Sequence, residues 1–581
     1  MKKRSNGSLA RPTALVVVLA GLAAAAAVVG AAQSEAHGNS PNDRHDNGRH
    51  YGWADWNKWP GHDYGHGHGH GGGNHGPKPL PRTDVVQTEY GAVKGFIKDD
   101  VRTFLGMPLA APPVGDLRWR PPVKPAKWRG VRDAVEYGSM CAQNKRLLDF
   151  GAPSTSEDCL YINVFAPAKS PRKRPVMVWI HGGGHTVGAG DGHDGSALVQ
   201  GNDVLVVTFN YRLNAFGFLV HPALDGSGKT TNYGFLDQTF ALKWVQRNIA
   251  AFGGDPDNVT IFGESAGGIA VLYQLISPKS KGLFHRAIIE SGSVFWRKLP
   301  TLATAETAGM NFAASLGCTD QSAACLRNLS VQQILSIGDQ FNTAVNDGYT
   351  LNMNYREAFE TGRFNRVPIL NGVNRDEYRW FTALSEVNSG HVVTADEYSE
   401  RLEAVFGVEA APSVERLYPL HKYSSPSEAL SAAVGDGNFV ICGSRNLNQA
   451  ASKYVPVYGY EFTDRNSPQV FPPVSFPYGA AHTSEIQYIF RNYRGARVEP
   501  LPPLSRAQQE LSKQMVAYWG TFAENGDPNV RSQPRWPRYA KRDDRVMELR
   551  TGAPRVISDF AKVHHCEFWD DYNLDLSGPI N

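Results

Sequence analysis

The sequence has few cysteines, and no two of them form a Cys-x-x-Cys pair. Six occur in the 581 residues: Cys141, Cys159, Cys318, Cys325, Cys442 and Cys566. Structural zinc sites commonly take their ligands from such closely spaced pairs, so a zinc-binding fold is disfavoured. An even number of widely spaced cysteines instead indicates disulfides in an exported protein, with several pairings open.

The sequence also lacks long hydrophobic runs, with one exception near its start. That run extends from Ala14 to Ala32 and ends in small residues that suit a cleavage site. Four basic residues precede it: Lys2, Lys3, Arg4 and Arg11. We predict that residues 1–32 are a secretory signal, so that the mature protein is extracellular and has no stable membrane span. An uncleaved anchor is the alternative, because the run is just long enough to cross a bilayer.

An excess of charge of one sign is absent as well. The formal net charge is +3, and removal of the four cations of the signal segment lowers it to −1. No dense cluster of lysine and arginine remains in the rest of the chain. This near-neutral balance argues against nucleic acid as the main partner.

Residues 33–82 lack the apolar periodicity that a folded core needs. They hold eight of the 18 histidines: His37, His45, His50, His62, His66, His68, His70 and His75. We predict a disordered, solvated linker that precedes a single domain at residues 83–581. Histidines that alternate with glycine on a flexible chain can also capture a divalent metal ion, so a metal-binding surface protein is a second hypothesis.

The rest of the chain alternates β-type apolar runs with helical patterns and has no internal repeat. The predicted strands cover residues 175–180, 204–209, 259–262, 287–289 and 367–370. Leu236, Phe240 and Trp244 recur every four residues, and with Val245 and Ile249 they predict a helix between the second and third strands. This alternation predicts an α/β fold with a largely parallel sheet covered on both faces.

Ser265 is the candidate nucleophile. It stands in the sequence Gly-Glu-Ser-Ala-Gly at residues 263–267, directly after a predicted strand and before an apolar helical stretch. Glycines on both sides permit a sharp turn from strand to helix, which lifts the serine hydroxyl clear of the sheet. Because the helix N-terminus points free N–H groups at this position, the turn suits nucleophilic catalysis.

Two further parts of a serine hydrolase site have candidates. Consecutive glycines follow the strand that ends before His181, and backbone N–H groups of Gly183, Gly184 and Ala266 would form an oxyanion hole. Residues 376 and 377 follow a later strand, so either Asp376 or Glu377 would be the acid. The histidine is one of five downstream of the acid, among which His482 follows small residues that suit a loop near a cleft: His391, His421, His482, His564 and His565.

These motifs resemble the type B carboxylesterase family of α/β-hydrolases, which includes cholinesterases and bile-salt-type lipases. The resemblance covers about Val85 to Trp569 and is carried by residues 104–108, 111–115, 157–164, 253–268, 376–377 and 479–485 in that order. It implies an α/β-hydrolase fold, hydrolysis of carboxylic esters without a cofactor, and a triad of Ser265, Glu377 and His482. It also implies three disulfides: Cys141 with Cys159, Cys318 with Cys325, and Cys442 with Cys566.

The chain departs from this family pattern near the expected acyl pocket. His185 stands where an aromatic residue usually follows the glycines, which would make the pocket floor more polar. The loop between Cys141 and Cys159 lacks the tryptophan that binds quaternary ammonium groups in cholinesterases, so choline esters are disfavoured. Three large aromatic residues either line the pocket or pack in the core: Trp296, Trp380 and Phe381.

Two alternatives to a soluble-ester hydrolase stay open. A lipase needs an apolar lid, for which the segment containing Leu147, Leu148 and Phe150 is the candidate. Some relatives of the fold are non-catalytic adhesion modules that have lost triad residues, but this chain retains all three. Ser291 corresponds to a position that supports the triad acid in relatives, or it is a buried structural serine.

Overall fold

The computed structural model describes residues 82–144, 152–169, 172–224, 231–437, 439–469, 471–490, 493 and 502–572. The predicted signal at residues 1–32, nearly all of the His-rich segment and the candidate lid around Leu147 lie outside the described residues. Within the described residues, no helix is both long and apolar enough to cross a membrane.

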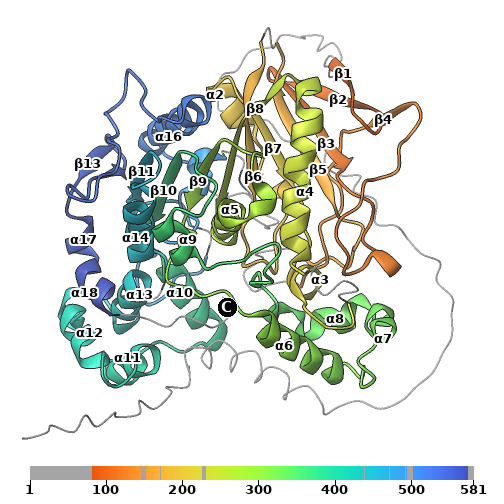
Figure 1. Ribbon diagram of the computed structural model, residues 1–581. Helices are drawn as coiled ribbons and strands as arrows, with labels where there is room; N and C mark the ends of the chain where they lie inside the picture. The colour runs from red at the N-terminus through yellow and green to blue at the C-terminus, as the bar shows by residue number, and fades with distance from the viewer. Residues whose placement is uncertain are drawn as a thin grey trace, which may run out of the picture.

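The described residues form one central sheet of 13 strands (Figure 1). Its middle is parallel, as the alternation of strands and helices predicts. The parallel strands are, in order across the sheet, β7 (Leu205–Phe209), β6 (Arg174–Ile180), β8 (Gly254–Glu264), β9 (Arg286–Glu290), β10 (Ile369–Asn374), β11 (Val457–Phe462) and β12 (Val546–Leu549). Short β-branched and aromatic runs that are buried on both faces account for these strands.

The margins of the sheet are antiparallel, which the sequence analysis did not predict. On one side lie β1 (Arg82–Gln87), β2 (Ala92–Lys98), β3 (Val101–Pro108) and β5 (Tyr161–Pro167), and on the other β13 (Arg555–Ile557). The short strand β4 (Val131–Asp133) runs parallel to β2. Figure 1 shows β1, β2 and β4 on the opposite side of the molecule from β13.

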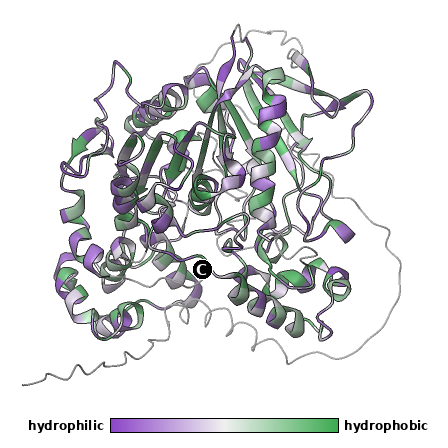
Figure 2. Ribbon diagram, viewed as in Figure 1, coloured by the Kyte–Doolittle hydropathy of each residue, from purple (hydrophilic) through white to green (hydrophobic). Residues whose placement is uncertain are grey.

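Helices cover both faces of the sheet, and successive strand residues serve opposite faces. In β6, Val176 and Val178 join the core beneath α4 (Tyr233–Asn248), α5 (Ala266–Ile276) and α14 (Ile441–Ala451). Met177 and Trp179 join the core beneath α2 (Ser196–Gly201) and α16 (Arg506–Asn525). Successive residues of a central strand face opposite sides of the sheet, and helices cover both sides. Both sets of residues are therefore apolar, and the strand reads as a continuous apolar run (Figure 2).

The predicted helix between β7 and β8 is α4, and the predicted stripe is buried only in part. Trp244, Val245 and Ile249 are buried, whereas Leu236 and Phe240 are only half-buried. Residues spaced by four drift around a helix by about 40° at each step, so a row of this spacing lies only partly on the contact face.

The remaining helices lie in the connections between strands or after β13. They are α3 (Asn214–Phe218), α6 (Leu302–Ser315), α7 (Ala323–Asn328), α8 (Val331–Ile337), α9 (Tyr355–Thr361), α10 (Arg379–Ser389), α11 (Tyr398–Phe406), α12 (Ala411–Leu417), α13 (Pro426–Gly437), α15 (Ile486–Ile489), α17 (Phe560–Val563) and α18 (Cys566–Asp571). In Figure 1, α6 to α8 and α10 to α13 gather near the lower edge of the sheet. Strand β10 ends at this edge, because α10 begins five residues after it.

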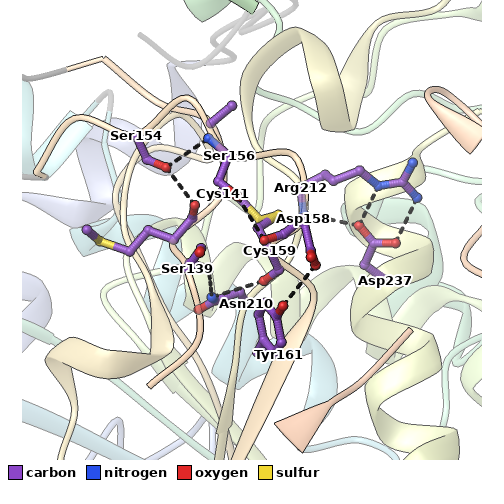
Figure 3. The surroundings of a disulfide bond; sticks show 12 residues. Ser139, Cys141, Ser154, Ser156, Asp158, Cys159, Tyr161, Asn210, Arg212 and Asp237 are labelled. Atoms are coloured by element: carbon purple, nitrogen blue, oxygen red, sulfur yellow. Dashed lines mark hydrogen bonds and ion pairs between the residues drawn. A yellow bond between two sulfur atoms is a disulfide. The ribbon is translucent and has the colours of Figure 1, made fainter. Parts of the chain in front are cut away.

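Three disulfides connect the six cysteines in the pairing that the family resemblance implies. Figure 3 shows the surroundings of Cys141 and Cys159, where the side-chain amide of Asn210 donates to the carbonyl oxygens of Cys159 and Ser139. The bridge between Cys442 and Cys566 has the largest sequence separation, 124 residues. It therefore restricts the unfolded chain most.

A buried ion cluster holds the C-terminal helices against the sheet. His564 Nδ1 lies 2.6 Å from the Asp436 carboxylate, and its Nε2 lies 2.9 Å from that of Glu461. Burial disfavours the charged imidazole, but the two carboxylates prevail and raise the pKa of His564 to about 10. The side chain is therefore an imidazolium in the folded protein at neutral pH.

We expect this cluster to make the protein sensitive to alkaline pH. A histidine whose pKa rises on folding contributes its full stability below about pH 6.5 and loses it as the pH rises towards 10. The loss is on the order of 5 kcal/mol. Urea unfolding at pH 7 and pH 9.5 measures the greater part of this loss, and His564→Gln should reduce the difference between the two conditions. An equal unfolding free energy of the native sequence at both values would contradict this assignment.

Candidate active site

Ser265 lies at the sharp turn between β8 and α5. Its backbone has φ 57° and ψ −124°, an unfavourable conformation for a residue with a side chain. The turn is held by the Ser265 N–H, which donates to the Glu290 carbonyl at 2.9 Å. A Cβ at Gly267 would meet the Ile180 carbonyl oxygen at 2.0 Å, so only glycine fits there.

The structure brings Ser265, His482 and Glu377 into one hydrogen-bonded chain. Ser265 Oγ lies 2.7 Å from His482 Nε2. His482 Nδ1 lies 2.6 Å from Glu377 Oε2, and Glu377 Oε1 accepts the Asn374 N–H at 2.8 Å. Glu377 is fully buried and His482 is 3% exposed. Because Nδ1 faces a carboxylate, it carries the proton, and Nε2 is left to accept from the serine hydroxyl.

The other candidates from the sequence lie elsewhere. The Asp376 carboxylate turns away from His482 and pairs with two arginines, Arg379 and Arg465. His391 is at the surface beside Glu397, and His564 belongs to the C-terminal ion cluster. Among the alternatives considered for the acid and the histidine, only Glu377 and His482 therefore contact the Ser265 chain of hydrogen bonds.

The glycine loop after β6 lies against the serine turn. A Cβ at Gly182 would lie 3.2 Å from the Ser265 Cβ. Gly183 and Gly184 have φ values of 100° and 63°, a region that favours glycine. Ala266 is the first residue of α5, so its N–H has no acceptor within the helix. These positions leave the three N–H groups available as oxyanion donors, a role that stays a prediction.

His185 does not form the polar pocket floor that the sequence suggested. It is 1% exposed and packs among the rings of Tyr211, Phe218 and Tyr273. Its Nδ1 lies 2.8 Å from the Asn342 carbonyl oxygen and donates to it. Burial lowers the pKa of His185 to about 4, so the ring is neutral at physiological pH. The His185 ring is therefore packed in the protein interior among other rings, with a hydrogen bond to the Asn342 carbonyl oxygen.

A second group of carboxyl side chains surrounds the triad, and the sequence analysis gave it no role. Glu264 Oε1 lies 3.3 Å from His482 Nε2, close to the same nitrogen that meets Ser265. Burial and the neighbouring carboxylates of Glu485, Glu377 and Glu290 raise the pKa of Glu264 well above its usual range. Burial also raises the pKa of Glu485 to about 7.

Glu264 is therefore protonated at neutral pH and Glu485 is partly so, which limits the negative charge beside the triad. Ser291 lies beside these acids, and its Oγ donates to Glu485 Oε1 at 3.5 Å. The only sequence signal for a role of Glu264 near the triad is its position in the serine motif. The sequence alone does not place Glu485 near Ser291, because that contact depends on long-range folding.

Three aromatic rings lie close to the His482 imidazole. Its ring centroid lies 5.1 Å from that of Phe381, 5.4 Å from that of Phe439 and 6.5 Å from that of Trp380. All three rings are half-buried. Trp296 instead packs on Phe295 and beneath the Arg356 guanidinium. Of the three aromatic residues singled out in the sequence, Trp380 and Phe381 therefore lie near the triad histidine.

The mixed sheet and the serine turn between β8 and α5 define the protein as an α/β-hydrolase. The chain matches the Carboxylesterase family over residues 82–569 and belongs to that family. This confirms the resemblance drawn from the sequence motifs. The protein is accordingly a carboxylic ester hydrolase.

Several characterised relatives are esterases. The chain is 39% identical to the fumonisin B1 esterase of Sphingopyxis macrogoltabida, over 79% of this chain and 85% of that protein. It is 37% identical to the para-nitrobenzyl esterase of Bacillus subtilis strain 168, over 78% and 92%. Among solved structures, a PNB esterase matches with a TM-score of 0.70 at 34% identity, covering 84% of this chain and 99% of that chain.

Proposed function

We propose that the protein is a secreted serine esterase that works through an acyl-enzyme on Ser265. In the first half-reaction, the Ser265 Oγ attacks the ester carbonyl carbon while His482 Nε2 accepts the hydroxyl proton. Glu377 stabilises the imidazolium that forms. The N–H groups of Gly183, Gly184 and Ala266 stabilise the oxyanion of the tetrahedral intermediate.

The first half-reaction ends when the His482 imidazolium donates its proton to the leaving alkoxide, which departs as the alcohol and leaves Ser265 acylated. In the second half-reaction, a water molecule gives a proton to His482 Nε2 and attacks the acyl carbonyl carbon. Collapse of this second intermediate breaks the bond to Ser265 Oγ, which takes the proton back from His482, and frees the carboxylic acid. No step in this sequence needs a cofactor.

One observation carries this proposal: two short hydrogen bonds that link the Ser265 hydroxyl through His482 to the buried Glu377 carboxylate. Mass spectrometry of the protein after reaction with a fluorophosphonate tests it. We expect one adduct per chain, on the peptide that contains Ser265, with activity lost in proportion to labelling. Full activity after complete labelling, or labelling confined to another serine, would refute the mechanism.

The substrate class that fits the site is a carboxylic ester with an apolar group beside His482. Half-buried rings of Phe381, Phe439 and Trp380 offer apolar contact there. Relatives named for different esters, among them an acylcarnitine hydrolase of Mus musculus, indicate that the family scaffold accepts varied groups.

Rates on p-nitrophenyl esters from acetate to palmitate distinguish two versions of this proposal. A maximum at short or medium acyl chains supports a carboxylesterase that acts on soluble esters. Rates that rise to palmitate and increase further at a lipid interface support the lipase alternative.

Export rests on the N-terminal apolar run and on three disulfides, since such bonds persist in oxidising compartments. Expression of the full chain in its native host should place the enzyme in the culture medium, with an N-terminus near residue 33. An intact N-terminal methionine on a cell-retained enzyme would support the uncleaved anchor instead.

A further inference from the structure

Asp376 is a buried charged residue beside the triad acid, yet it has no place in the proton-transfer chain. Its side chain is 5% exposed. It follows β10 directly before Glu377, so the two carboxylates leave the same turn in different directions. A buried carboxylate is costly unless it is paired and hydrogen-bonded, so its partners define what it does.

The first partner of Asp376 is the backbone of the loop that carries His482. The Ala480 N–H donates to Asp376 Oδ2 at 3.0 Å, and the Asp376 N–H donates to the Ala480 carbonyl oxygen at 3.0 Å. Ala480 lies two residues before His482, and Asp376 lies one residue before Glu377. This reciprocal pair therefore fixes the two loops against each other next to the Glu377 to His482 contact.

Two arginines fix the orientation of the Asp376 carboxylate. Arg465 binds both of its oxygens, with Nε 2.9 Å from Oδ2 and Nη2 2.8 Å from Oδ1. Arg379 Nη2 lies 3.0 Å from Oδ1, and its Nη1 donates to the Pro477 carbonyl oxygen at 2.8 Å. Arg379 thus contacts both the carboxylate and the segment that leads into the His482 loop.

Glycine at position 479 makes this approach possible. Gly479 has a φ of 64°, and a Cβ there would lie 2.4 Å from Asp376 Oδ2. A side chain would therefore push the carboxylate away from the Ala480 N–H. The glycine at this position is explained by the Asp376 contact that it admits.

We propose that Asp376 is a positioning residue, which acts through the His482 loop to keep the imidazole between Ser265 and Glu377. This inference rests on the proposed triad. Loss of the Asp376 carboxylate leaves the three reacting groups present but releases the loop that aligns one of them. Since a misplacement of about 1 Å can cost about 100-fold in rate, the effect falls on kcat rather than on substrate binding.

The test compares Asp376→Ala with Asp376→Asn and with a matched control, Asp464→Asn. Asp464 is also buried, and its carboxylate accepts hydrogen bonds from Tyr488 and Gln508. Steady-state and burst kinetics on p-nitrophenyl butyrate are measured well below each variant's melting temperature. We expect kcat of Asp376→Ala to fall by about 100-fold with KM within about threefold of the native value.

Asp376→Asn keeps an oxygen for the Ala480 N–H and should recover at least about tenfold of that loss. Asp464→Asn should lower the melting temperature but leave kcat within about threefold. The inference is overturned if Asp376→Ala retains native kcat, if KM alone changes, or if Asp464→Asn loses as much kcat as Asp376→Ala. Should Asp376→Ala not fold, the same criteria apply to Asp376→Asn, with an expected loss of about tenfold. A native enzyme without turnover or a burst would count against the proposed function itself.

Discussion

Replacement of Ser265 by alanine should lower kcat on p-nitrophenyl esters by about a millionfold. In the proposed mechanism the hydroxyl forms the covalent bond and the triad members act as a unit, so the histidine and glutamate alone cannot compensate. Alanine fits the site sterically, because it only removes an oxygen at a half-buried position. The melting temperature should therefore change little.

The measurement needs a control for contaminating esterases and for general damage to α5. Ser277→Ala provides it, since Ser277 caps the opposite end of the same helix and bonds the Thr350 carbonyl oxygen at 2.7 Å. That variant should keep native kcat. Residual turnover of Ser265→Ala that survives repeated purification at more than about one part in a thousand would remove Ser265 from its assigned role.

Replacement of Glu377 by glutamine should lower kcat by about 10,000-fold. Glutamine has nearly the same shape, but its amide nitrogen cannot accept a hydrogen bond. At this fully buried position, the glutamine amide would favour the His482 tautomer in which Nδ1 accepts a hydrogen bond and Nε2 carries the proton. That nitrogen would then face the Ser265 hydroxyl as a donor and could not take its proton.

Two measurements separate this effect from simple misfolding. The crystal structure or circular dichroism of Glu377→Gln should match the native protein, and the loss should fall on kcat with KM nearly constant. Asp376→Asn, one residue earlier, should lose far less. Equal losses for the two substitutions would mean that the adjacent carboxylates cannot be assigned distinct roles.

The sequence singled out Ser265 as the candidate nucleophile because the geometry of its turn is set locally. Gly263, Ser265 and Gly267 specify the turn through backbone conformation and close packing, which a five-residue motif is enough to signal. The acid was ambiguous from spacing, because Asp376 and Glu377 are neighbours. The turn after β10 decides between them, since the Asn374 N–H binds Glu377 while the arginines bind Asp376.

Features that depend on contacts between distant segments were harder to predict. The parallel middle of the sheet followed from alternating strands and helices, but no strand was predicted for residues 82–108, where β1, β2 and β3 follow one another with no helix between them. His185 looked like a pocket residue from its position, yet the rings of Tyr211 and Tyr273 enclose it. The contact of Glu264 with His482 could not be predicted, because the two residues are 218 positions apart in the sequence.

The bridge between Cys442 and Cys566 makes a closed ring of chain that contains His482 but neither Ser265 nor Glu377. A protease that cuts once inside this ring would leave a nicked enzyme whose two pieces remain one covalent species. On a denaturing gel such a species would migrate as one band until a reductant separated the fragments. The disulfide therefore keeps the segment that contains His482 attached to the rest of the enzyme after a backbone break that would otherwise release it.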